Sequence, residues 1–324
     1  MKKIFSLLLI TFFSTSLFAY PITPRPLRKL IIESENIVWA KVIEIGSTKP
    51  DKKNVNIWER DYALIKVNEI LKGNLQQKTI KVYFCSGMIC PAPGVFYEGE
   101  EVLTFIDKRD KIDGYEVHAL SYGVKHGLSQ PEYQLYKTRI NEMQKLEEEC
   151  DPRRKDEQIL EWLVKCAEQP ATRWEGVYEL SPQSDLMSFY DRENSIRKDI
   201  FLSTAQKHRL FDALFTTDTL QYFDIPLIDI VNGINDSAIL VLLKSGLLKI
   251  DKEYLWPAQD IMERIVRLTG SIELEKLSEE FSEIYYSSDE KEKKRASEIL
   301  KEFINKMKAT GLKQILLASD NSDS

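Results

Sequence analysis

The chain is poor in the residues and motifs on which most enzyme chemistry depends. Its 324 residues include only three histidines, His118, His126 and His208. No Gly-x-Ser-x-Gly nucleophile elbow, no His-Glu-x-x-His zinc motif and no glycine-rich phosphate loop occurs in it. His118 and His126 follow one another closely, but two ligands do not make a zinc site without a third. The sequence therefore favours a binding protein over an enzyme and indicates no catalytic residue, metal or cofactor.

An excess of basic charge is also missing. The chain has 45 lysines and arginines against 51 aspartates and glutamates, which gives a net charge of -6. Its densest basic cluster, Lys291–Arg295, is interrupted by Glu292 and lies on a helical pattern, so a solvated helix face explains it. Acidic chains of this kind bind nucleic acids and anionic membranes poorly. We expect no nucleic-acid partner.

Long apolar runs are absent apart from one near the N-terminus. Met1-Lys2-Lys3 precedes an apolar run, Ile4–Phe13, and the small residue Ala19 follows. This order is typical of a secretory signal peptide, and the run is shorter than the roughly 20 residues that span a bilayer. We expect residues 1–19 to be cleaved, leaving a periplasmic or secreted protein that begins at Tyr20. An uncleaved anchor is the less favoured alternative, and no integral membrane segment is predicted.

Four cysteines suggest disulfides in an oxidising compartment. Cys85 and Cys90 could close a loop between strands, and Cys150 and Cys166 each end a helical pattern and could join two helices. Four cysteines allow three connectivities, and the one made of these two pairs is favoured because both pairs close short loops. A zinc site is the weaker alternative, because neither a Cys-x-x-Cys spacing nor a nearby histidine supports it.

The pattern of apolar residues divides the chain into two parts. Residues 20–130 show the alternation and turn signals of a small β-barrel or sandwich. The expected strands are Ile37–Ile45, Tyr62–Leu71, Thr79–Phe84, Glu101–Asp107 and Tyr115–Val124. We therefore predict an α+β protein with two domains, of which the first is a small barrel.

From Pro131 onward the apolar spacing becomes helical. Tyr133, Tyr136, Ile140 and Met143 fall on one face of the first helical pattern, which Pro131 can open. Residues 131–318 are predicted to form an all-α domain, either a bundle or a HEAT-like helical array, because no fixed repeat length is found. Residues 319–324 are a polar tail that we expect to be disordered.

The first domain resembles the OB-type barrel (the oligonucleotide/oligosaccharide-binding fold) of netrin modules and tissue inhibitors of metalloproteases. The residues that carry the resemblance are Ser34–Val42, Ile65–Gly73 with its final Lys-Gly, Cys85, and Phe96–Phe105. The resemblance covers about a third of the chain and implies an OB-like barrel that binds another protein. Those inhibitors chelate the protease zinc through an N-terminal cysteine, whereas Tyr20 would stand there in this chain. The inhibitory mechanism therefore cannot be carried over, and Tyr20 is retained only as a binding candidate.

The most distinctive string of the helical part is Arg173-Trp174-Glu175-Gly176, followed by Tyr178. An exposed aromatic and basic recognition patch is one interpretation. Packing of Trp174 and Tyr178, four residues apart on one helix, against a neighbouring helix is the favoured alternative.

These observations lead to a first hypothesis of an exported binding protein. It would engage another exported or envelope protein through the barrel and a helical surface. An exported hydrolase with an unrecognised site between the domains is the second hypothesis, and a structural envelope component is the third.

Overall fold

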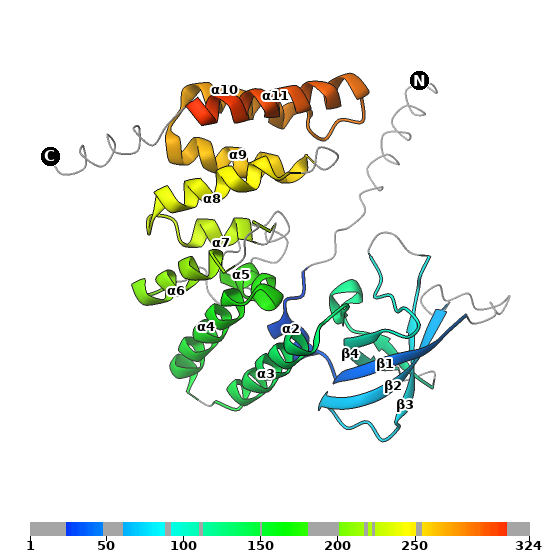
Figure 1. The fold of residues 1–324 in the computed structure, drawn as a ribbon. Coiled ribbons are helices and arrows are strands. Elements are labelled where there is room, and N and C mark those ends of the chain that lie inside the picture. The colour runs from blue at the N-terminus through cyan, green and yellow to red at the C-terminus, as the bar shows by residue number, and fades with distance from the viewer. Residues whose placement is uncertain are drawn as a thin grey trace, which may run out of the picture. The chain divides into compact units, whose positions relative to one another are not determined.

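The computed structural model describes residues 24–47, 61–87, 92–109, 113–149, 151–180, 201–216, 220–221, 224–250 and 255–309. They form two compact units, with the boundary between Cys166 and Ala167 (Figure 1). We call them the barrel unit and the helical unit. The domain boundary expected at residues 130 and 131 does not coincide with this division, because two long helices after the barrel belong to the first unit.

The strands of the barrel unit close into a ring. The strands that form it are β1 (Asn36–Ser47), β2 (Asp61–Lys72), β3 (Thr79–Phe84), β4 (Glu101–Lys108) and β5 (Tyr115–Val117). β1 pairs antiparallel with both β2 and β4, and β2 pairs antiparallel with β3. β3 runs parallel to β5, which pairs antiparallel with β4 and completes the circuit. Within the described residues this is a five-stranded OB-like barrel, as the sequence predicted.

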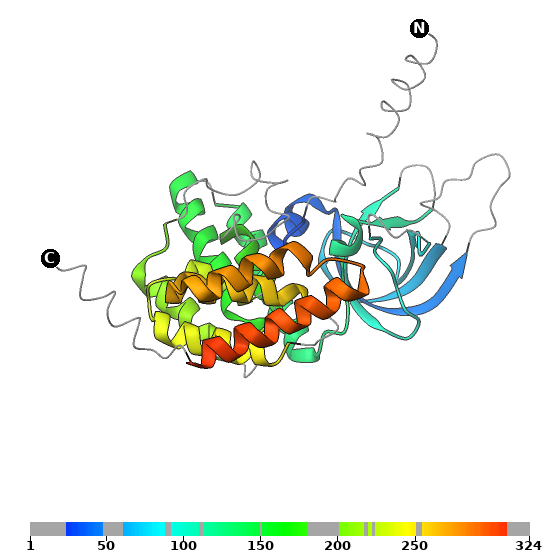
Figure 2. The ribbon, with the colours of Figure 1, turned by 90° about the horizontal axis from the view of Figure 1, so that it is seen from above.

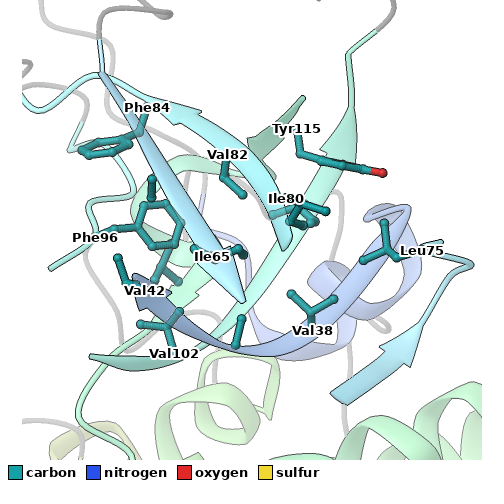
Figure 3. Packing of buried hydrophobic residues seen from close by; sticks show 14 residues of the cluster. Val38, Val42, Ile65, Leu75, Ile80, Val82, Phe84, Phe96, Val102 and Tyr115 are labelled. Atoms are coloured by element: carbon teal, nitrogen blue, oxygen red, sulfur yellow. The ribbon is translucent and has the colours of Figure 1, made fainter. Parts of the chain in front are cut away.

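The inward face of each strand fills the barrel. The predicted alternation is confirmed in β3, where Ile80, Val82 and Phe84 are buried and the intervening residues are not. Figure 3 shows these side chains gathered with those of β1 and β2, Val42 and Ile65 among them. Full burial of an aliphatic side chain contributes about 1.5–3 kcal/mol, so this cluster is the main source of the barrel's stability.

The strand predicted over Tyr115–Val124 is wrong beyond Val117. Ala119 and Leu120 follow with φ angles of 57° and 56°, and a 3₁₀ turn over Leu120–Gly123 leads into the short β6 (Val124–Lys125). A Cβ atom on Gly123 would overlap the carbonyl oxygen of His118. The chain therefore folds back on itself so closely that only glycine fits, which ends the extended conformation.

Three helices accompany the barrel strands in the chain: α2 (Leu27–Glu33) precedes them, and α3 (Gln130–Glu147) and α4 (Pro152–Glu168) follow them, α4 crossing the boundary of the unit. The predicted face of α3, formed by Tyr133, Tyr136, Ile140 and Met143, is buried throughout. The ring of Tyr133 stacks on that of Trp39 in β1 at a centroid distance of 4.2 Å, which attaches α3 to the barrel. α2 was not predicted, since its seven residues are too few to show a helical period.

The helical unit is a succession of helices, several of which pack on the next helix in the chain. They are α5 (Arg173–Leu180), α6 (Thr204–Leu214), α7 (Asp224–Ile230), α8 (Asp236–Leu248), α9 (Trp256–Thr269), α10 (Ile272–Ile284) and α11 (Glu290–Ala309). α8 packs on α9, α9 on α10, and α10 lies beside α11 in both views (Figure 1 and Figure 2). The predicted helical domain is thus confirmed, and its order of contacts is that of an array. None of the described helices combines the length and apolar character needed to cross a bilayer.

Candidate functional site

The outer surface of β2 and β3 carries a group of aromatic and basic side chains, which we call the tyrosine face: Tyr62, Leu64, Lys81 and Tyr83. Because Ala63, Ile65, Ile80 and Val82 point into the barrel, the alternating residues on both strands point outward. Tyr62 is the register partner of Tyr83, and Leu64 is the partner of Lys81. The four side chains are half-buried and adjacent.

The geometry of the tyrosine face combines two rings with one cation. The ring centroids of Tyr62 and Tyr83 lie 6.4 Å apart at an interplanar angle of 64°. The Lys81 ammonium lies 4.3 Å from the Tyr62 centroid and 5.8 Å from that of Tyr83. Both rings attract it through their negative faces. The surface therefore offers flat apolar area together with one positive charge.

Two glycines, Gly46 and Gly114, leave room for the tyrosine rings to lie against the backbone. A Cβ atom on Gly46 would lie 2.7 Å from Cε1 of Tyr62, and one on Gly114 would lie 2.6 Å from Cε2 of Tyr83. The Tyr62 hydroxyl also donates a 3.5 Å hydrogen bond to Glu44. Contacts with their neighbours thus restrict the side-chain conformations of both rings, so less conformational entropy is lost when a ligand covers them.

A second polar cluster joins α2 to the barrel and is centred on His118. Its Nδ1 lies 2.7 Å from Oδ2 of Asp107 in β4, and its Nε2 lies 3.4 Å from Oε2 of Glu33 at the end of α2. Burial disfavours the charged imidazole, but hydrogen bonds and attraction from both carboxylates outweigh it and raise the pKa of His118 above 6.5. The pKa of Asp107 is lowered, because its bonds to His118 and to the Glu35 N–H outweigh the effect of burial.

This cluster ties elements together and does not present a base to a ligand. Both ring nitrogens of His118 face carboxylates of the same unit. Lys72 reinforces the junction by donating to the carbonyl oxygens of Ile31 and Ser34, each at 2.6 Å. These carbonyls end α2, where a cation offsets the negative end of the helix dipole. The Lys-Gly string that carried the family resemblance therefore has a structural role here.

No family model, no curated protein and no solved structure matches this chain. The resemblance to netrin modules and metalloprotease inhibitors stays an expectation from the sequence. The barrel itself is established by its strand pairing.

The cysteines are placed in part. Cys85 is buried and lines a cavity of about 40 Å³ with Phe84, Pro93 and Leu120. Cys166 is buried in α4. Cys90 and Cys150 lie outside the described residues, so both predicted disulfides stay predictions. Among the described residues no three histidine, cysteine, aspartate or glutamate side chains come close enough to hold a metal ion.

The string Arg173–Tyr178 of the helical part, for which packing was the favoured interpretation, is largely buried. Arg173 is 2% exposed, and its guanidinium pairs with the buried Asp224 of α7 and donates to the carbonyl oxygen of Ala213 at 2.8 Å. Tyr178 is also buried, and its ring lies 5.5 Å from that of the half-buried Trp174. An exposed aromatic and basic surface is therefore wrong for Arg173 and Tyr178. Tyr20, the remaining candidate, lies outside the described residues.

Sequence reasoning did not find the tyrosine face. The signal was present in the alternation, since Tyr62 and Tyr83 occupy the positions between buried residues on two predicted strands. Which of these residues meet across the strands depends on the register, which the pattern alone does not give.

Proposed function

We propose that the protein is an exported, non-catalytic binding protein that recognises another exported or envelope protein through its barrel unit. The observation that carries the proposal is the tyrosine face, where two seated aromatic rings bracket Lys81 on the outside of the barrel. Export rests on the sequence of residues 1–19.

The chemistry of this face suits a protein partner. Tyrosine supplies a large, rigid contact area with a polar tip and is enriched in interfaces, at a low cost in side-chain entropy. Lys81 adds attraction for a carboxylate that would approach from the partner. In OB-type barrels the surface of the second and third strands is a usual place for oligonucleotides and oligosaccharides, and the tyrosine face lies there. The net charge of -6 disfavours a nucleic acid as that ligand.

The helical unit supports the same role with a second surface. Arrays of short helices form extended faces that are common in protein recognition. Phe215 at the end of α6 and Val241 in α8 are large apolar side chains on its surface.

Co-purification from the native envelope tests the proposal. The tagged wild-type protein should retain a specific partner, and the double variant Tyr62→Ser/Tyr83→Ser should retain at least about tenfold less of it, because both aromatic anchors are removed. Tyr97→Ser is the matched control, since Tyr97 is 61% exposed on the same unit but lies outside the tyrosine face. Far-UV circular dichroism would verify that each variant is folded.

Two results would contradict the proposal. One is the absence of any partner above background with the wild-type protein. The other is a double variant that retains the partner as well as Tyr97→Ser does.

A further inference from the structure

A groove between α9 and α10 is lined almost wholly by hydrogen-bond acceptors. We call it the acceptor groove, and its volume is about 210 Å³. Its lining residues are Gln259, Glu263 and Val266 of α9 and Glu275, Ser278, Glu279 and Ser282 of α10. The spacing of three and four residues along each helix places these side chains on the facing surfaces of the two helices. The groove belongs to the helical unit alone and is separate from the tyrosine face.

The floor of the acceptor groove contains polar atoms without partners. Gln259 is 7% exposed and Ser278 is 5% exposed, and among the residues that the structure describes neither Oε1 of Gln259 nor Oγ of Ser278 has a hydrogen-bond partner. The Gln259 amide nitrogen donates to Glu263 at 2.6 Å, which fixes the amide and leaves its oxygen as a pure acceptor. Buried polar atoms without partners are uncommon, and these two can accept hydrogen bonds from a group that enters the groove.

The rim of the acceptor groove is negatively charged. Glu263, Glu275 and Glu279 are exposed there, and no lysine or arginine of the described residues forms an ion pair with any of them. The nearest cation along α9, Arg264, is turned to Asp229, with Nε 3.1 Å from that carboxylate. Three carboxylates around one opening therefore remain available to a positive ligand.

The donor requirements of the groove point to one class of ligand. A metal ion fits poorly, because among the described residues no three histidine, cysteine, aspartate or glutamate side chains gather closely enough to hold one. An ammonium has only three donors, whereas a guanidinium has five in a plane and can reach several acceptors at once. The volume is below the roughly 300–1,000 Å³ of sites for drug-sized ligands, so it suits a single side chain.

We propose that the acceptor groove binds a guanidinium group, presented as an arginine side chain by a protein partner. Glu275 and Glu279 would attract the cation at the rim, and Gln259 and Ser278 would accept hydrogen bonds from its N–H groups on the floor. This proposal does not depend on the tyrosine face, and the two can be tested separately.

Titration of the full-length protein with capped peptides tests the ligand. The probe is N-acetyl-Ala-Arg-Ala-amide, and the control peptide carries citrulline, which has the same shape without the charge. The arginine peptide should shift the amide NMR signals of α9 and α10 and bind at least about tenfold more tightly than the citrulline peptide. Free arginine is a third probe. Binding of the peptide above that of free arginine supports a protein source, and equal or tighter binding of free arginine would overturn that part of the proposal.

Variants of the rim test the site. Glu275→Gln/Glu279→Gln should weaken binding of the arginine peptide about tenfold or more, and Ser278→Ala should weaken it by a smaller factor. Glu283→Gln is the matched control, because Glu283 is exposed on α10 outside the groove and should leave binding unchanged. The proposal would be overturned by equal binding of the citrulline peptide, or by a double variant that binds as well as Glu283→Gln.

Discussion

Replacement of Asp224 by asparagine should destabilise the helical unit by about 3–5 kcal/mol, the usual cost of breaking a buried ion pair. Asp224 is 1% exposed and Arg173 is 2% exposed, so water cannot compensate the guanidinium once the carboxylate is neutral. The substitution also creates a geometric conflict. Asp224 accepts from Arg173 through one oxygen and from the Gln221 N–H at 2.7 Å through the other, so the new amide must turn its own N–H groups toward a donor.

Urea unfolding of the full-length protein, followed by far-UV circular dichroism, measures this loss. A loss of this size is a large fraction of the about 5–15 kcal/mol that stabilises most domains. Glu273→Gln is the control, because Glu273 pairs with Lys306 on an exposed surface and its loss should change stability by less than about 1 kcal/mol. The double variant Arg173→Met/Asp224→Leu should be less destabilised than the sum of its single variants, since no unpaired charge remains.

A stability of Asp224→Asn within about 1 kcal/mol of the wild type would refute the reasoning. It would mean that the pair is hydrated or that Arg173 is held by its carbonyl partners alone.

Two further predictions concern the turn after β5. Because the folded pKa of His118 is raised, its pairing with Asp107 should stabilise the protein fully below about pH 6.5 and lose that effect as pH rises through the folded pKa. The free energy of unfolding in urea should therefore fall more between about pH 5.5 and about pH 8.5 for the wild type than for His118→Gln. His208 is exposed, so His208→Gln should behave as the wild type does. Equal falls in all three proteins would contradict the pairing. Gly123→Ala should cost about 1–3 kcal/mol, because the added methyl overlaps a backbone carbonyl, and a melting temperature equal to that of the wild type would show that the turn can relax.

The regular parts of the fold could be predicted because their apolar periods are complete. β3 begins and ends where its alternation does, at Thr79 and Phe84, and the four predicted residues of α3 are all buried. The helical domain was predicted in the same way, because the apolar spacing becomes helical from Pro131 onward.

Features that depend on contacts between distant segments could not be predicted. α2 has only seven residues, and its last turn is stabilised by Lys72, which lies far along the chain in β2. The strand after Tyr115 ends early because of the close approach between His118 and Gly123, which no alternation reveals.

The candidate sites were missed for the same reason. The tyrosine face depends on the register between β2 and β3, and the acceptor groove depends on how α9 packs against α10. Arg173 was only a weak binding candidate, because packing was the favoured interpretation of its string, but the sequence did not show what Arg173 packs against. Its partner Asp224 is remote in sequence, and only the folded unit brings the two together.

Site-specific photocrosslinking in the native host tests the central claim most directly. A photoreactive residue in place of Leu64, which belongs to the tyrosine face, should give one abundant crosslinked partner. The same residue in place of Lys145, which is exposed on α3 of the same unit, should not give it. No adduct from position 64, or the same adduct from both positions, would contradict recognition through the tyrosine face.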